Sequence, residues 1–257
     1  MSRVICVANQ KGGVGKTTTS INLAAALAVL EHRTLLIDCD PQANATSGLG
    51  VPTQGLAADL YSVIYKPTPE NVRSAIVEVK APFLNVLPAS LDLVAVEVEL
   101  VSEIGREFYM RTLIEQIADD YEFIVIDCPP SLGILTLNAL CAADELLIPL
   151  QCEYFALEGI AKLFGTYHKV RKINPKLRIL GVLLTMFDSR NRLSHDIREE
   201  VERNMPQYLL ETIIPRNVRV SEAPSHGRSI IHYDVRSKGA TAYLNLGSEI
   251  VDRRAVA

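Results

Sequence analysis

A glycine-rich segment near the N-terminus has the residue types needed to bind phosphate groups. Residues 9–18 read NQKGGVGKTT, and they lie between an apolar run and a stretch with helical spacing. This is the strand, loop and helix order of a phosphate-binding loop. Gly12, Gly13 and Gly15 permit the backbone conformations that turn successive N–H groups inward, and Val14 lies between them. Because a helix N-terminus adds partial positive charge, we expect the loop to hold nucleotide phosphates.

Three side chains of this segment could complete the contacts to a nucleoside triphosphate. Lys16 is placed to reach the β- and γ-phosphates, and the Thr17 hydroxyl to hold Mg²⁺. Thr18 could add a polar contact to a phosphate oxygen. The usual pattern has a glycine where this chain has Gln10, and a second lysine, Lys11, follows it. The loop is therefore a variant that carries a lysine at its start.

Carboxylates end two of the expected strands. Asp127 closes the run Phe123–Asp127, and the run Thr34–Asp38 leads to Asp40. The carboxyl ends of parallel strands share one edge of a sheet, so these carboxylates could hold a water on Mg²⁺ beside the loop. Strand residues alternate in direction. Asp38 and Asp40 should therefore face the same way if the strand continues to residue 40.

Apolar runs alternate with helix-like stretches along most of the chain, which predicts βαβ units around a mostly parallel, twisted sheet. The expected architecture is a three-layer α/β/α fold in one domain spanning residues 1–257. The expected strands are Arg3–Ala8, Thr34–Asp38, Phe83–Pro88, Phe123–Asp127, Glu145–Leu150, Leu177–Thr185 and Leu209–Ile214. The expected helices are Thr17–Leu30, Leu91–Ala118, Phe155–Ile173, Ser194–Met205 and Gly239–Val251. The proline-containing stretch Val51–Lys80 has weak periodicity and is expected to be a surface excursion.

Composition indicates a globular protein that needs no disulfides. The chain has 257 residues, of which 48% are apolar and 22% charged, close to the soluble average. No apolar run reaches the roughly 18 residues of a membrane span, and the N-terminus lacks a signal layout, so we expect a cytoplasmic location. The five cysteines lie within or beside apolar runs without metal-ligand spacing, and we expect them to be reduced and buried.

The charge is distributed unevenly along the chain. The overall net charge is −4, but residues 1–160 hold 9 Lys and Arg against 20 Asp and Glu, whereas residues 161–257 hold 17 against 10. Such asymmetry suggests a polyanionic partner for the basic half.

Several segments together resemble the ParA/Soj group of partition ATPases, which have a deviant phosphate-binding loop. They are residues 11–18 (KGGVGKTT), 38–42 (DCDPQ), 127–131 (DCPPS), 215–219 (PRNVR) and 221–227 (SEAPSHG). The resemblance runs from about residue 2 to about residue 250 and implies a P-loop NTPase-like fold. Because residues 1–4 lead directly into the first expected strand, the chain is similar to the short, chromosomal type, which has no operator-binding domain at its N-terminus.

The resemblance implies ATP and Mg²⁺ as ligands and ATP hydrolysis as the activity. In this family two subunits enclose two ATP molecules, and Lys11 would reach the phosphates of the other subunit's nucleotide. Lys11, Lys16, Asp40 and Asp127 would be the catalytic residues. Thr17, Asp40 and Asp127 would act on the Mg²⁺ side, with Asp40 in the segment that orients the attacking water.

The resemblance also implies where adenine binds and how hydrolysis is controlled. Adenine would lie near Pro215 and Asn217. No glutamate follows Asp127 to act as a strong general base, so we expect weak intrinsic hydrolysis that a ParB/Spo0J-type centromere-binding partner stimulates.

Arginines of the basic half are candidates for DNA contacts. Arg190 and Arg219 are at positions that contribute to sequence-independent DNA binding in Soj-like relatives, and Arg192 and Arg216 are their neighbours. The sequence contains no base-reading motif, so contacts to double-stranded DNA should be to phosphates. The resemblance thus implies a nucleoid-associated protein that binds DNA as an ATP-dependent homodimer.

Three other classes of protein share parts of this pattern. A MinD-like ATPase acting at membrane surfaces is the strongest alternative, but it needs a basic amphipathic C-terminal helix, and residues 243–257 contain two acids, a glycine and no aromatic residue besides Tyr243. A P-loop ligase or kinase would need a substrate pocket that the sequence does not mark. An iron-sulfur reductase would need paired cysteines such as Cys128 and Cys152 in glycine-rich loops. We therefore expect no membrane partner.

Overall fold

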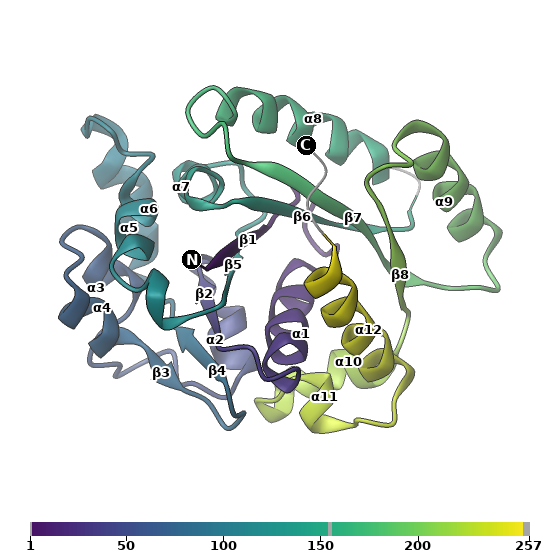
Figure 1. Cartoon of the computed structure of the whole chain (residues 1–257), viewed down its shortest axis with the longest axis horizontal. Helices are drawn as coiled ribbons and strands as arrows, with labels where there is room; N and C mark the ends of the chain where they lie inside the picture. Colours follow the sequence, from purple (N-terminus) through teal and green to yellow (C-terminus); the bar gives the residue numbers. More distant parts are fainter. Residues whose placement is uncertain (1, 154–155, 254–257) are drawn as a thin grey trace.

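One eight-stranded sheet runs through the residues that the computed structural model describes, 2–153 and 156–253 (Figure 1). The strand order is β3-β4-β2-β5-β1-β6-β7-β8. All neighbouring strands are parallel except β3 and β4, which pair antiparallel at one edge. The strands are β1 (Arg3–Val7), β2 (Thr34–Asp38), β3 (Val77–Glu78), β4 (Leu84–Leu87), β5 (Phe123–Asp127), β6 (Glu145–Gln151), β7 (Arg178–Phe187) and β8 (Leu209–Pro215). The predicted α/β class with a mostly parallel sheet is confirmed.

Helices cover both faces of the sheet, and in Figure 1 α7 and α8 lie above it while α1 and α12 lie below it. The lower layer holds α1 (Lys16–Val29), α2 (Asn44–Gly48), α10 (Val218–Glu222), η3 (Ala223–His226), α11 (Ile230–Tyr233) and α12 (Lys238–Asp252). The other layer holds α3 (Leu60–Ile64), α4 (Pro69–Ala75), α5 (Leu93–Glu99), η1 (Leu100–Ser102), α6 (Tyr109–Glu115), η2 (Ala118–Asp120), α7 (Ile134–Ala142), α8 (Ala156–Val170) and α9 (Arg192–Asn204). Within the described ranges, no helix has the length and apolar character that crossing a membrane requires.

Central strands are apolar at every position because both of their faces are covered. In β1, Ile5 and Val7 point into the core on the α1 side, whereas Val4 and Cys6 point into the core on the α7 side. Each of these side chains is at most 5% exposed. Burial on both faces explains why the strand sequences show no alternation. All five cysteines are free and buried, as predicted.

The prediction of one helix over Leu91–Ala118 is wrong. The structure has α5, η1 and α6 in this segment, with a turn at Gly105, whose φ of 72° lies in the left-handed region. A right-handed helix cannot continue through that conformation. The helical periodicity arose because α5 is apolar on two faces: Leu93 and Val96 are buried, whereas Val98 is 73% exposed.

The stretch Val51–Lys80 is not merely a surface excursion, because it forms α3, α4 and β3. Asp59 caps α3 by accepting a hydrogen bond from Ser62 N at 2.9 Å, and Thr68 caps α4. Pro69 is at the start of α4, where proline favours a helix rather than interrupting it. The stretch contributes buried side chains to the core, namely Leu60, Val63, Ile64, Val72 and Ala75.

Helix α7 was not predicted at all. Six of its nine residues are buried, and these include polar Thr136 and Asn138. A helix buried on nearly every side has no solvent face, so the polar and apolar spacing that marks surface helices is missing. The predicted helix Phe155–Ile173 begins at a residue outside the described part, and α8 accounts for residues 156–170.

Candidate functional site

The ends of the central strands bring the predicted functional segments to one edge of the sheet. β5 lies between β1 and β2, and Asp127 is in register with Val7 of β1 and with Asp38 of β2. The glycine-rich loop follows β1 directly, and the acidic segment follows β2. Parallel pairing therefore places the loop and the carboxylates side by side, as the order of the elements predicted.

The loop between β1 and α1 depends on glycine at two positions. Gly13 and Gly15 have φ values of 77° and 86°, in the left-handed region that other residues rarely adopt. Around Gly12 and Gly13 nothing lies within 4 Å of where a Cβ would be. The backbone at these two glycines is therefore open to a ligand, as a phosphate cradle requires.

Neighbouring strands hold the loop in place from both ends. Asn9 donates from Nδ2 to the Pro149 carbonyl at 2.8 Å, and its Oδ1 accepts from Lys11 N at 3.1 Å. Thr185, near the end of β7, donates to the carbonyl of buried Val14 at 2.8 Å. These contacts fix the loop before any ligand arrives, so little ordering is needed on binding.

Lys16 is a buried lysine whose amine is aimed at the inside of the loop. Its residue is 6% exposed, and Nζ donates to the Lys11 carbonyl at 3.1 Å. Burial lowers the pKa of Lys16, and the charges of Asp127 and Asp40 partly oppose that shift. A buried cation held by a carbonyl is well placed to exchange that contact for a phosphate oxygen.

Asp127 leaves one carboxylate oxygen without a partner in the described structure. The residue is fully buried, and Oδ1 accepts from Ser20 Oγ at 2.8 Å, but Oδ2 has no hydrogen-bond partner among the described residues. Burial raises the pKa of Asp127 to about 8, and the charge of Asp38 adds to the rise. An unpaired buried carboxylate is costly unless a ligand satisfies it. A hydrated cation at this point would do so.

The residues present fit a magnesium ion that is held mainly by a substrate. In the part of the chain that the structure describes, no three His, Cys, Asp or Glu side chains converge as a metal cage. Mg²⁺ usually takes one or two protein ligands together with waters and substrate phosphates. Thr17, half-buried in the first turn of α1, and Asp127 are suited to that arrangement.

Asp38 and Asp40 have different environments. β2 ends at Asp38, so the condition for both side chains to face the same way is not met. Asp38 is fully buried and accepts from Thr46 N at 2.8 Å and from Thr46 Oγ1 at 2.7 Å, which anchors the start of α2. Asp40 is 7% exposed and accepts from Gln42 N at 2.9 Å. Asp40 therefore lies in the turn at the sheet edge, whereas Asp38 supports the structure beneath it.

Lys11 forms an ion pair within its own chain. Its Nζ lies 2.8 Å from Glu153 Oε2, just beyond the end of β6, and the two side chains are 31% and 47% exposed. Sequence reasoning missed Glu153, although its position after a parallel strand that neighbours β1 was a usable signal. The Lys11 amine is thus near the surface beside the loop, where a second molecule could reach it.

A pocket of about 250 Å³ opens next to the loop. Pro215 and Asn217, predicted near the adenine, line it together with Gly15 and Thr18. Met186, at the end of β7, also lines it and was not predicted. The residues at the end of β8 therefore lie beside the loop, although β6 and β7 separate β8 from β1 in the sheet. Spacing in the sequence could not predict this proximity.

The four candidate arginines lie around the ends of β7 and β8, and all are exposed. Arg190 and Arg192 have side chains 88% and 94% exposed, and Arg190 pairs with Asp188 at 3.0 Å. Arg216 N donates to the Phe187 carbonyl at 3.0 Å, so the β7 and β8 ends are adjacent. The arginines therefore share the sheet edge that carries the loop.

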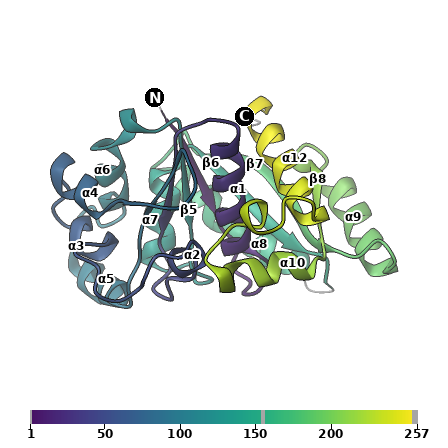
Figure 2. The same ribbon diagram turned by 90° about the horizontal axis from the view of Figure 1, so that it is seen from below.

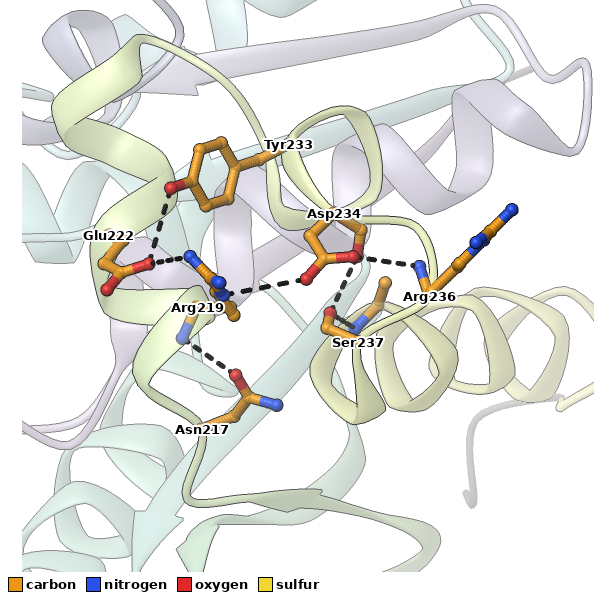
Figure 3. A network of polar contacts seen from close by, with 8 residues as sticks. Asn217, Arg219, Glu222, Tyr233, Asp234, Arg236 and Ser237 are labelled. Carbon is orange, nitrogen blue, oxygen red and sulfur yellow. Dashed lines mark hydrogen bonds and ion pairs between the residues drawn. The ribbon is translucent and has the colours of Figure 1, made fainter.

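Arg219 is held by two carboxylates (Figure 3). Its Nη1 lies 2.9 Å from Glu222 Oε2, and its Nε lies 3.8 Å from Asp234 Oδ2. Arg219 N donates to Asn217 Oδ1 at 2.9 Å, and the Tyr233 hydroxyl donates to Glu222. The network connects the pocket residue Asn217 to Arg219, whose side chain remains 56% exposed.

The fold and the site together define a P-loop nucleotide-binding protein of the α/β class. A family model described as an AAA domain matches residues 2–179. The chain is 51% identical over 254 residues to the chromosome partitioning protein ParA of Myxococcus xanthus, covering 98% of this chain and 89% of that protein. It is 48% identical over 251 residues to the sporulation initiation inhibitor protein Soj of Bacillus subtilis, covering 97% and 98%. The chain belongs to the ParA/Soj family, which confirms the resemblance.

A solved structure shares the whole architecture. Cobyrinic acid a,c-diamide synthase from Mycobacterium smegmatis, with a bound ATP analogue and magnesium, is 36% identical and has a TM-score of 0.84. The similarity covers 96% of this chain and 93% of that one.

Proposed function

We propose that this chain is a partition ATPase that segregates chromosomes or plasmids. It binds ATP with Mg²⁺, pairs with a second copy around the nucleotide, and holds double-stranded DNA without sequence preference while paired, which associates it with the nucleoid. A ParB-type centromere-binding protein stimulates hydrolysis. The observation that carries the proposal is the joint placement of the loop with its two lysines, the neighbouring pocket and the exposed arginines at one sheet edge.

Nucleotide binding is supported by the donors that the site presents. The backbone at Gly12 and Gly13 would face the phosphates, Lys16 would contact the terminal ones, and Thr18 with Pro215 and Asn217 would enclose the base and sugar side. When bound, Mg²⁺ would neutralise charge on the phosphates.

Hydrolysis is expected to be slow for the chain alone. Asp40 would orient the attacking water, and no glutamate follows Asp127 to act as a strong general base. A partner would then be needed to complete the site.

Pairing is supported by the position of Lys11. Two triphosphates facing each other across an interface repel, and a cation between them offsets that repulsion. Lys11 would exchange its contact with Glu153 for the phosphates of the partner's nucleotide. Since the Lys11–Glu153 pair is half exposed, breaking it costs little.

Replacing Lys11 with alanine tests the pairing step. The variant should bind ATP with nearly unchanged affinity, because Lys16 and the loop amides remain. Pairing should weaken by at least about 100-fold, because each of two nucleotides loses a charge-assisted contact. Size-exclusion chromatography with light scattering and ATP titration would measure both quantities.

The exposed Lys172→Ala on the far side of the molecule is the matched control and should behave as the unsubstituted chain does. If Lys11→Ala pairs as well as the unsubstituted chain, the cross-subunit role of Lys11 is wrong.

DNA binding is supported by the exposed arginines and by the basic charge of residues 161–257. Phosphate contacts of this kind are sequence-independent and weaken as salt concentration rises. One subunit offers few contacts, but two paired subunits on one duplex raise the effective concentration of the second set. Equal DNA retention with ATP, with ADP and without nucleotide would contradict this switch.

Replacing Glu222 with glutamine should strengthen DNA binding. Arg219 would lose its closer carboxylate, and a negative charge would leave the surface that DNA phosphates approach. We expect about a threefold to tenfold gain in affinity in the presence of ATP, largest at low salt. Fluorescence anisotropy with a random-sequence duplex would measure this affinity.

Glu199→Gln on α9 is the control, because it removes one exposed carboxylate elsewhere. An equal gain in DNA affinity for Glu199→Gln would show that the change in net charge, and not the release of Arg219, is responsible.

A further inference from the structure

An exposed apolar stripe over residues 91–104, the segment that contains α5 and η1, has no partner in the described structure. It consists of Leu91, Val94, Val98, Val101 and Ile104, and we call it the α5 stripe. These side chains are 67%, 50%, 73%, 63% and 99% exposed. Val94, Val98 and Val101 are spaced by three or four residues, which places them along one side of α5 and η1. Leu91 precedes α5, and Ile104 follows the extended residue Glu103.

The α5 stripe is a concentration of exposed apolar side chains rather than a scatter. Of the eleven large hydrophobic residues exposed among the described residues, five belong to it. The opposite face of the segment already supplies the core, through buried Leu93, Val96 and Leu100. The core packing of this segment therefore does not use the stripe. A contiguous exposed apolar patch of this kind typically marks a site of interaction.

Acidic residues flank the α5 stripe. Asp92, Glu97, Glu99 and Glu103 are all exposed, and residues 91–107 contain one basic residue, Arg106. A second copy of this chain packed on the stripe about a two-fold axis would bring like charges together, which disfavours self-association. Charge complementarity instead selects a basic amphipathic helix, whose apolar side covers the stripe while its lysines and arginines meet the carboxylates.

The α5 stripe lies next to the segment that follows Asp127. Glu97 of α5 lies against Gly133, so closely that a side chain at Gly133 would collide with its carboxylate. Helices α5 and α7 also pack together. In Figure 2, α5 lies on the same lower side of the molecule as α2 and α10, which follow the carboxyl ends of β2 and β8. A helix docked on the stripe would therefore contact α5, which packs against α7, the helix that follows the Asp127 segment.

We propose that the α5 stripe is the docking surface for a basic amphipathic helix of the protein that stimulates hydrolysis. This inference rests on the proposed function, because it assigns the surface through which the ParB-type partner acts. Docking at the stripe would connect the partner to the loop between Asp127 and α7 through Glu97.

The test compares two stripe variants with a control in the full chain with ATP. The first, Val98→Ser with Val101→Ser, removes exposed apolar surface and leaves the core intact. The second, Glu103→Lys, reverses one flanking charge. Val235→Ser, at a residue 59% exposed elsewhere, is the control. The probe is the ParB-type protein of the same organism, titrated while phosphate release is followed, with chain pairing measured in parallel.

Both stripe variants should keep the intrinsic hydrolysis rate and ATP-dependent pairing, but need about tenfold more partner for half-maximal stimulation. The control should match the unsubstituted chain. Unchanged stimulation of the stripe variants would overturn the inference and leave the proposed function intact. Loss of pairing with normal stimulation would also overturn it, because the stripe would then be an interface between two copies of the chain. Failure of the unsubstituted chain to respond to the partner would instead overturn the partner's part in the proposed function, and the docking inference with it.

Discussion

Replacing Lys16 with alanine is expected to abolish productive ATP binding and to leave the chain monomeric at every nucleotide concentration. The Lys16 amine is buried inside the loop, where it contacts the Lys11 carbonyl at 3.1 Å and where no other described cation takes its place. Charge-assisted contacts of this kind are worth about 1.5–3 kcal/mol each, and two phosphates would share this amine. The affinity for ATP should therefore fall by on the order of 100-fold or more. Isothermal titration and light scattering would show the loss of binding and of pairing.

The same substitution should barely change folding. Burial disfavours the charged form of Lys16 and lowers its pKa, so replacing it with neutral alanine removes a desolvation cost together with the contact of the amine. Circular dichroism should show native secondary structure. The exposed Lys169→Ala on α8 is the control. ATP binding by Lys16→Ala within a few-fold of the unsubstituted chain would show that the loop is not the nucleotide site.

Replacing Asp40 with alanine should trap the nucleotide-bound pair. Asp40 is nearly buried in the turn after β2, with one oxygen engaged by Gln42 N at 2.9 Å. If Asp40 orients the attacking water, its loss should slow hydrolysis by about 100-fold, which is the lower end of the usual contribution of such a group. ATP contacts such as those of Lys16 and Lys11 do not involve this side chain. Pairing should therefore form normally and then persist.

Two measurements distinguish a trapped pair from a damaged one. Single-turnover hydrolysis should slow, and the lifetime of the pair should lengthen by a similar factor, because hydrolysis is the step that loosens the interface. Asp119→Ala, at an exposed position in η2, should change neither quantity. If Asp40→Ala hydrolyses ATP at the unsubstituted rate, Asp40 has no role in the reaction. If its hydrolysis is slow but the two subunits still dissociate rapidly, the lifetime of the pair does not depend on hydrolysis.

The α5 segment shows where periodicity in a sequence misleads. Leu93 and Val98 are both apolar and both contribute to helical spacing, yet one is fully buried and the other 73% exposed. The pattern predicted one long amphipathic helix, whereas in the structure the helical conformation ends at Ser102, a turn with Gly105 follows, and a second apolar side faces outward. Helix α7 shows the converse, since burial on nearly all sides removed the pattern that would have predicted it.

By itself, the sequence determined the α/β class, most strand positions, the glycine-rich loop and the family. These features are local: a continuous apolar run, three glycines followed by Lys16 and Thr17, and an aspartate at a strand end each depend on residues close together in the chain. Parallel pairing then made the meeting of Asp127 with the loop predictable.

Only the tertiary structure decided which side chains are partners across the molecule. Glu153 lies 142 residues from Lys11 in the chain, and Thr185 lies 171 residues from Val14, so no local pattern could pair them. The unpartnered Asp127 oxygen, the pocket beside Pro215 and the exposure of the α5 stripe likewise depend on how distant elements pack. Burial and hydrogen-bond partners are properties of packing, and packing is set by the order of strands in the sheet rather than by their order in the chain.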